Sequence, residues 1–174
     1  MTRIIKNNSN IINNVLAENY LKGDVNAKLR LVEYADFQCP ACSFYSPILS
    51  KIYDDINREY GSSSISMAYK YFPLIQIHKN AMISAQSAEA AGMQGKFWEM
   101  HDVIFEHQND WSEALDAKVK IENYAKDLGL DMDKFKFDRD SENVINKINS
   151  SYKEGVKIGI DSTPSIFLNG VKVE

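Results

Sequence analysis

The chain has 174 residues, of which 44% are hydrophobic and 25% are charged, as in an ordinary globular protein with one sizeable core. Its formal net charge of -4 provides no basic surface for nucleic acid, so nucleic-acid binding is not expected. No apolar run approaches the ~18 residues that a membrane-spanning helix needs.

Residues 1–24 differ in composition from the rest of the chain. They are rich in asparagine, and their apolar residues recur at rough helical spacing, which predicts an N-terminal arm or a short helix. The domain itself is expected to span residues 25–174. The first residues contain no apolar stretch like the core of a signal peptide, so export would require a leader or anchor already removed.

A buried strand followed by a helix is predicted next. Residues 28–36 (KLRLVEYAD) are apolar and β-branched, and the following two residues form a turn. Pro40 suits the first position of a helix, which makes Cys39 its N-cap, and Pro47 predicts a kink further along. One face of this helix is expected to turn toward the core; its members are Tyr45, Ile48, Leu49, Ile52, Tyr53, Ile56 and Tyr60.

The remainder of the chain alternates between strands and a long helical stretch. Residues 65–72 alternate between apolar and polar positions and predict a second strand. Residues 78–159 predict a helical insertion, with breaks near residues 92–95, 111–112, 129 and 138–141. Residues 163–168 predict a third strand, Asn169-Gly170 a type I′ turn, and residues 171–173 the start of a fourth strand.

Cys39 and Cys42 are the only cysteines, and their spacing indicates a reactive pair rather than a structural disulfide. A disulfide between them would close almost no loop in the unfolded chain. The thiol at the helix start faces unpaired amides and the positive end of the helix dipole, which favour its thiolate form. The second thiol lies one turn along, close enough to attack a mixed disulfide on the first.

A metal site is the alternative for this cysteine pair, and the sequence does not favour it. A structural zinc ion needs four ligands, and the chain has no second cysteine pair. His101 and His107 would lie about 120° apart on a helix, and His101 shares a helical stripe with apolar residues, so a packed core position is expected for it. Neither these nor His78 is assigned to catalysis.

The segment Glu33-Tyr-Ala-Asp-Phe-Gln-Cys-Pro-Ala-Cys42, together with Thr163-Pro164 far downstream, resembles the DsbA-like branch of the thioredoxin superfamily. The resemblance runs from about residue 25 to the end and includes Pro47, which matches a helix-kinking proline. It implies an α/β thioredoxin fold with a helical insertion between the second and third strands. The final helix of such a fold is expected to be missing after residue 174.

The resemblance also implies an activity and a role for each site residue. It implies a protein thiol-disulfide oxidoreductase without metal or organic cofactor, in which Cys39 is the exposed attacking sulfur, Cys42 the buried resolving thiol, and Pro40-Ala41 the dipeptide between them. Pro164 is then a cis-proline beside the dithiol. Because a proline cannot donate to a sheet, the backbone of Thr163 is expected to remain free to pair with substrate.

Glu33 matches an acid that many family members bury behind the dithiol. It shares a strand face with Leu29, Leu31 and Ala35, so an inward position is one interpretation, in which it accepts the proton of Cys42. An exposed strand-edge glutamate is the other interpretation, and Asp36 is a weaker candidate for the same role.

Ala41 departs from the strongly oxidising members, which carry a histidine there. The expected function is nonetheless a dithiol oxidase that forms disulfides in reduced or misfolded exported proteins, in the periplasm or cell envelope. By the same resemblance its recycling partner is a membrane quinone-linked oxidase of DsbB or vitamin K epoxide reductase type. A disulfide reductase or isomerase, and a non-catalytic peptide-binding or chaperone-like module, are the alternatives.

Overall fold

Two apolar segments form the central strands of the computed structural model, which describes residues 20–173. These strands are β2 (Leu29–Ala35) and β3 (Ile65–Tyr71), and they pair in parallel. Parallel neighbours need a crossover connection, which α2 (Pro40–Tyr60) supplies. Every residue of β3 is buried, as expected for a strand whose two faces are both covered. The two strands predicted for this part of the sequence are confirmed.

The sheet is completed by strands that run antiparallel to their neighbours. β4 (Ser165–Leu168) pairs with β2, and β5 (Val171–Lys172) pairs with β4. At the other edge β1 (Leu21–Lys22) pairs with β3, so the order is β1-β3-β2-β4-β5. The sequence had assigned Leu21 and Lys22 to an arm or helix, and residues 1–19 of that arm lie outside the described residues.

The turn between β4 and β5 has the predicted chemistry. Asn169 has a φ of 49° and Gly170 a φ of 80°. A type I′ turn requires positive φ at both central residues, which asparagine and glycine adopt more readily than other residues. The predicted hairpin is therefore confirmed.

The face of α2 that meets the sheet is only partly the predicted one. The buried residues of this helix include Leu49, and Tyr53 and Ile56 pack against the same core, as predicted. Ile48 and Ile52 were expected in the core but are each 40% exposed. The predicted stripe extends too far around the helix, because apolar spacing alone could not show where contact with the sheet ends.

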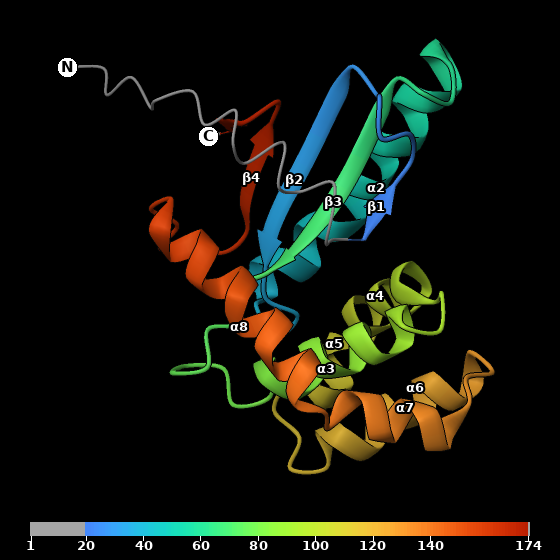
Figure 1. Cartoon of the computed structure of the whole chain (residues 1–174), viewed down its shortest axis with the longest axis vertical. Coiled ribbons are helices and arrows are strands. Elements are labelled where there is room, and N and C mark those ends of the chain that lie inside the picture. Colours follow the sequence, from blue (N-terminus) through green and yellow to red (C-terminus); the bar gives the residue numbers. More distant parts are fainter. Residues whose placement is uncertain (1–19, 174) are drawn as a thin grey trace.

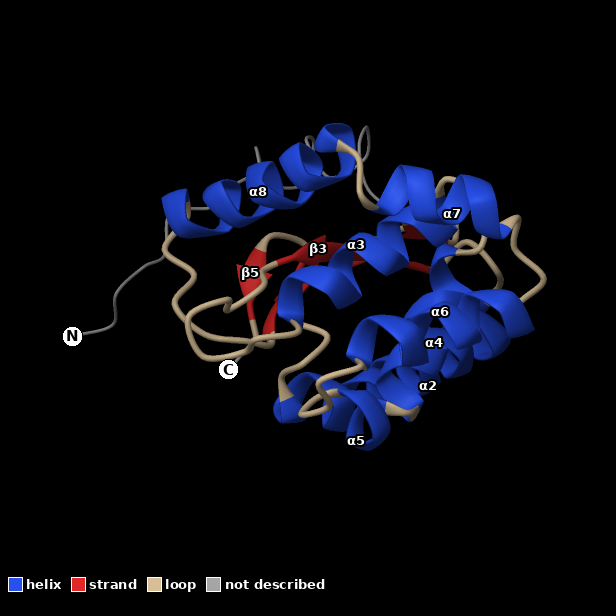
Figure 2. Cartoon of the chain, turned by 90° about the horizontal axis from the view of Figure 1, so that it is seen from below, coloured by secondary structure: helices blue, strands red, loops and turns tan. Residues whose placement is uncertain are grey.

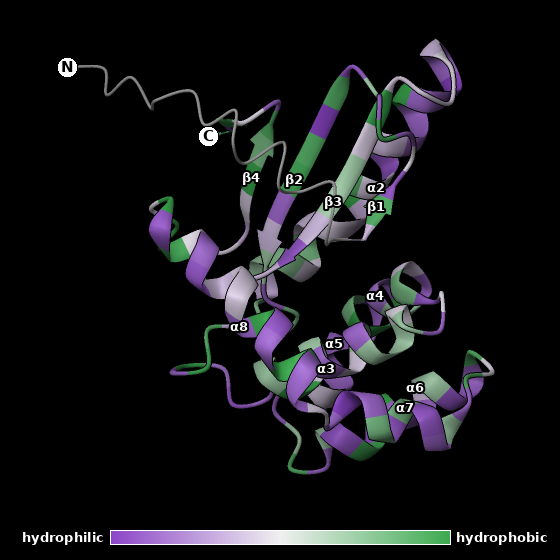
Figure 3. Cartoon of the chain, viewed as in Figure 1, coloured by the Kyte–Doolittle hydropathy of each residue, from purple (hydrophilic) through white to green (hydrophobic). Residues whose placement is uncertain are grey.

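Residues between β3 and β4 form the helical insertion, whose helices lie beyond the carboxyl ends of β2 and β3 (Figure 1). Helix α8 returns from this layer to the sheet and lies on the face opposite α2 (Figure 2). Hydrophilic residues predominate along α7 and α8, as Figure 3 shows. The helices are α3 (Ala81–Gly92), α4 (Phe97–Glu106), α5 (Gln108–Trp111), α6 (Ala117–Asp127), α7 (Met132–Arg139) and α8 (Glu142–Lys157).

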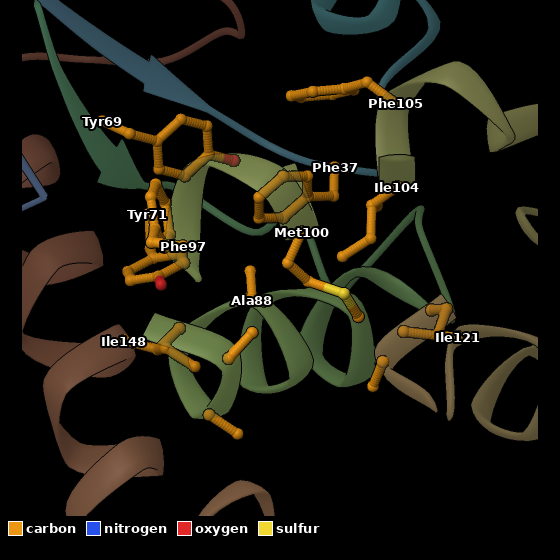
Figure 4. Close-up of a cluster of buried hydrophobic side chains, with 14 of the residues drawn as sticks. Phe37, Tyr69, Tyr71, Ala88, Phe97, Met100, Ile104, Phe105, Ile121 and Ile148 are labelled. Carbon is orange, nitrogen blue, oxygen red and sulfur yellow. The ribbon is translucent and has the colours of Figure 1, made fainter. Parts of the chain in front are cut away.

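The main core lies where the insertion meets the sheet. Aromatic side chains from the strands stand above the helix that carries Ala88 (Figure 4). Phe37, in the turn after β2, stacks on Tyr69 with ring centroids 4.9 Å apart. This packing fixes the turn that leads into α2. None of the helices in residues 20–173 has the length and apolar character to cross a membrane.

Candidate active site

Cys39 occupies the N-cap of α2, at the carboxyl end of the central strand β2. Its backbone is extended, with φ −72° and ψ 122°, and Pro40 takes the first helical position as predicted. Cys39 is 7% exposed and Cys42 is 0% exposed, so Cys39 is less accessible than the exposed sulfur that the sequence led us to expect. Pro40 and Ala41 between them are exposed.

The loop before β4 covers the sulfur of Cys39. The Cys39 sulfur lies 3.4 Å from the carbonyl oxygen of Thr163, to which it donates a hydrogen bond in its protonated form. The Thr163–Pro164 peptide bond is cis. Residues 124 positions apart in the sequence therefore meet at the start of α2. This contact explains the limited exposure of Cys39, and it occupies the carbonyl that was expected to be free.

The two thiols have opposite electrostatic environments. The Cys42 thiol donates to the Cys39 sulfur, and this hydrogen bond is the largest of the effects that lower the pKa of Cys39 to about 5. The side chain of Thr163 and the backbone amides of Ala41 and Cys42 also lower this pKa, while burial raises it. Burial raises the pKa of Cys42 well above the usual range of a thiol. Cys39 is therefore the thiolate, and Cys42 retains its proton.

Glu33 is buried behind the pair, so of its two interpretations the inward position holds and the exposed strand edge does not. It is 2% exposed, in the central strand β2, between Tyr69 of β3 and Ile166 of β4. Burial and, to a smaller extent, the Cys39 thiolate raise the pKa of its carboxyl group to about 8. A carboxyl group with this pKa can both take and release a proton near neutral pH.

Asp36 shapes the backbone around the site. Its carboxylate accepts hydrogen bonds from the amides of Gln38 at 2.8 Å and Leu74 at 2.9 Å, and contacts His78 Nδ1 at 2.6 Å. These contacts tie the turn before Cys39 to the loop after β3. No local pattern predicts the Asp36–His78 contact, because the two residues are 42 positions apart.

Gln108 of α5 is a second residue that the sequence did not indicate. Its side-chain amide donates to the carbonyl oxygens of Phe37 at 2.7 Å and Cys39 at 3.0 Å. The helical insertion thus holds both ends of the turn that presents Cys39. A glutamine in a helix is usually a surface residue, so nothing in the sequence pattern distinguished this one.

His101 is a core residue, as predicted. It is 1% exposed, and its ring lies edge-on to Tyr69, with centroids 5.2 Å apart. Burial lowers the pKa of its imidazole, which is therefore neutral at neutral pH. His107 lies near the surface and contacts Asp110, with 3.2 Å between Nδ1 and Oδ2.

Comparison with known proteins agrees with this arrangement. The sequence model of the family described as Thioredoxin matches residues 17–174. The chain belongs to this family. Its fold is a thioredoxin fold with a helical insertion between β3 and β4, of the DsbA-like kind.

Two solved structures illustrate the likeness in fold. A thioredoxin-like oxidoreductase from Silicibacter pomeroyi has 21% sequence identity and a TM-score of 0.76, covering 96% of this chain and 88% of that one. The protein α-DsbA1 of Wolbachia pipientis has 19% identity and a TM-score of 0.75, covering 91% of this chain and 80% of that one.

The curated sequence relatives of this chain are much longer proteins. The Na(+)/H(+) antiporter NhaA 1 of Mycolicibacterium vanbaalenii is 32% identical over 159 residues, which cover 88% of this chain but 24% of the antiporter. The chain thus spans about a quarter of the length of the curated relatives it matches.

Proposed function

We propose that this chain is a protein thiol-disulfide oxidoreductase of DsbA-like type that acts through Cys39 and Cys42. The observation that carries the proposal is a pair of thiols beside the Thr163 carbonyl, of which Cys39 has a lowered pKa and Cys42 a raised pKa. The Cys39 sulfur caps α2 and lies 3.4 Å from that oxygen, while Cys42 is 0% exposed one turn further along. Such an arrangement supports one attacking sulfur and one resolving sulfur.

The exchange proceeds in two displacements. A substrate thiolate attacks Cys39 of the oxidised pair, the bond between the two cysteine sulfurs breaks, and the Cys42 thiolate that leaves takes a proton from Glu33. A second substrate thiolate then attacks the substrate sulfur of the mixed disulfide and releases the Cys39 thiolate. This is a good leaving group, because the pKa of Cys39 is lowered to about 5. The substrate dithiol loses two electrons, and the cysteine pair gains them.

Dithiol oxidation is the proposed direction in the cell. A stabilised Cys39 thiolate favours the reduced protein and so makes the disulfide a better oxidant. Relative to a thioredoxin at about −270 mV, we expect a reduction potential of about −150 to −230 mV. Ala41 cannot supply the additional stabilisation of the thiolate that the family's histidine gives, so the potential should fall short of the most oxidising members.

Substrates and partners follow from this direction. We propose that reduced or misfolded exported proteins approach as extended segments and pair with the backbone at Thr163 beside Pro164. In the oxidised pair the Cys39 sulfur has no proton to donate, so the Thr163 carbonyl is then available to substrate. The site is proposed to work in the periplasm or cell envelope without metal or organic cofactor. Reoxidation would then come from a membrane quinone-linked oxidase of DsbB or vitamin K epoxide reductase type.

A turnover assay on a reduced, unfolded ribonuclease tests the proposal. The oxidised chain should convert ribonuclease thiols to disulfides faster than an equal concentration of oxidised glutathione, and Cys39→Ser should abolish the reaction. No turnover would favour the non-catalytic peptide-binding module instead.

Disulfide reduction or isomerisation is the second candidate function. It is favoured by Ala41, which stands where the strongly oxidising members carry a histidine that stabilises the thiolate. It would be preferred if the potential lay near −270 mV and if the reduced chain reshuffled scrambled ribonuclease more efficiently than the oxidised chain oxidised the reduced substrate.

A further inference from the structure

Three buried polar atoms beneath the cysteine pair have no hydrogen-bond partner among residues 20–173. They are Glu33 Oε1, the Tyr69 hydroxyl and His101 Nε2, on residues that are each 2% exposed or less. Leaving such a group unpaired costs about 1–3 kcal/mol, so several in one place call for an explanation.

These residues are neighbours although they come from three elements. Tyr69 of β3 stands directly opposite Glu33 of β2 in the parallel register, so the two side chains leave the same face of the sheet. His101 of α4 packs against Tyr69, with ring centroids 5.2 Å apart and the rings at 81°. The unpaired groups therefore form a series that leads from the cysteine pair toward α4.

The far side of His101 connects this series to solvent. Its Nδ1 lies 2.8 Å from Oδ1 of Asp102, whose side chain is 55% exposed, whereas that of His101 is 1% exposed. Asp102 lines a groove between α2 and α4 together with Ser43, Pro47 and Glu106. With a neutral imidazole and an Asp102 carboxylate, Nδ1 carries the proton and Nε2 is left as an acceptor in the core.

Glu33 needs such a connection, because at 2% exposure it has almost no contact with water. Each exchange cycle moves one proton between Cys42 and Glu33, and Glu33 must then recover its starting state. Other charges near the series are the Cys39 thiolate beside Glu33, Lys22 of β1 near His101, and the Asp36 carboxylate near Tyr69. The thiolate is the reacting group and the ammonium is already protonated, so neither can accept the proton of Glu33. The Asp36 carboxylate is already engaged by two backbone amides and by the His78 ring.

We propose that Tyr69, His101 and Asp102 form the proton route between Glu33 and solvent. This inference rests on the proposed thiol-disulfide exchange. When Cys42 resolves a mixed disulfide, its proton passes to the Glu33 carboxylate and its thiolate attacks the Cys39 sulfur. The Cys39–Cys42 bond forms, the bond from Cys39 to the partner sulfur breaks, and the partner sulfur leaves as a thiolate. The Glu33 proton then moves to the Tyr69 oxygen and the Tyr69 hydroxyl proton to His101 Nε2, each across an intervening water, because the three groups make no direct hydrogen bond to one another. The Nδ1 proton of His101 leaves through Asp102, and no electrons move along the route.

Resolution of a glutathione mixed disulfide tests the route in the full chain. The reduced protein is mixed with oxidised glutathione at pH 7 in dilute buffer, quenched at intervals, and the loss of the Cys39–glutathione adduct is followed by mass spectrometry. Tyr69→Phe removes only the unpaired hydroxyl, and Asp102→Asn keeps an oxygen that accepts from His101. Each variant should slow resolution about tenfold, with an unchanged reduction potential.

Asp110→Asn is the matched control, since it changes another aspartate that contacts a histidine, in the exposed His107–Asp110 contact outside the proposed route. It should resolve the adduct at the wild-type rate. Imidazole buffer at high concentration should restore the rate of Asp102→Asn, because the buffer can enter the groove that Asp102 lines and replace its carboxylate as the proton acceptor.

Two results would overturn the route: wild-type rates in both variants, or a rate loss accompanied by a proportional shift in reduction potential, which would indicate a structural effect. If the wild-type chain itself neither forms nor resolves the adduct, the proposed function fails. If the wild-type chain resolves the adduct and both variants match it, only the proton route fails.

Discussion

The reactivity of Cys39 depends on a donor that lies one helical turn away. The hydrogen bond from the Cys42 thiol is the largest of the effects that lower the pKa of Cys39 to about 5. With this pKa, Cys39 should be mostly thiolate at pH 6. Iodoacetamide at that pH should therefore label Cys39 at least tenfold faster than Cys42, whose pKa is raised by burial. Peptide mapping by mass spectrometry measures the two rates.

A pair of variants isolates the contribution of the donor. Cys42→Ser keeps a hydroxyl that can donate to Cys39, whereas Cys42→Ala removes the donor, so the pKa of Cys39 should be clearly higher in the alanine variant. Equal pKa values in the two variants, or faster labelling of Cys42 in the wild-type chain, would contradict this assignment.

Glu33 should make the folded protein less stable as the pH rises. The folded-state pKa of about 8 lies above the unfolded value of ~4.3, so the stability is fully present below pH ~4.3 and is lost as the pH rises through about 8. Glu33→Gln removes this penalty and should raise the free energy of unfolding at pH 7 by about 2–4 kcal/mol, while slowing exchange. Urea unfolding from pH 4 to pH 9 would contradict this if the two proteins gave parallel curves.

The sequence predicted the positions of residues whose roles depend on near neighbours in the chain. The roles of Cys39 and Pro40 follow from helix-end chemistry, and both occupy the predicted positions. The resemblance brought Pro164 to the same site. Gln108 and His78 were missed because their partners are 69 and 42 positions away, and no local pattern records such contacts.

At the scale of elements, α8 is fitted closely to the sheet at Gly155. A Cβ added there would lie 2.7 Å from two ring carbons of Phe72, which is itself 2% exposed. Alanine normally stabilises a helix interior by about 1 kcal/mol relative to glycine, but overpacking costs about 1–3 kcal/mol. Gly155→Ala should therefore lower the free energy of unfolding, as measured by urea titration.

Ser150→Ala, at an exposed position of the same helix, is the control and should leave stability within about 0.5 kcal/mol. Gly155→Ala combined with Phe72→Leu should lose less than the sum of the two single changes, because the smaller side chain makes room for the methyl group. If Gly155→Ala alone were more stable than the wild type, the Phe72 ring would be shown to move aside without a loss of stability.

Element boundaries were predicted well where periodicity was unambiguous and poorly where it was not. The strands β2 and β3 have long apolar runs, and both were found. The strand β1 has two residues, too few for any alternation to be seen. In α2, Tyr45 and Ile52 suggested a buried face that is in fact largely exposed, because contact with the sheet is set by Leu49 and its neighbours.

At the scale of the whole molecule, reduction of the cysteine pair should stabilise the folded protein. The pKa of Cys39 is depressed from ~8.5 in the unfolded chain to about 5, so the stability gained by the reduced form is complete above pH ~8.5 and is lost as the pH falls through about 5. At pH 7 linkage gives roughly 2–3 kcal/mol.

Denaturant unfolding of the oxidised and reduced forms at pH 7 and pH 4 checks this expectation. The reduced form should be the more stable at pH 7, and its advantage should be mostly gone at pH 4. Greater stability of the oxidised form at pH 7 would indicate a structural bridge and would remove the argument for an oxidant.

The hydrogen bonds from Gln108 to the carbonyls of Phe37 and Cys39 have a consequence for the newly made chain. The turn that presents Cys39 is held by a residue of the insertion, which is synthesised about 70 positions later. Until the insertion has docked, we expect both cysteines to behave as ordinary thiols. Selective exchange at Cys39 would then begin only when folding is nearly finished, so that docking of the insertion starts the activity.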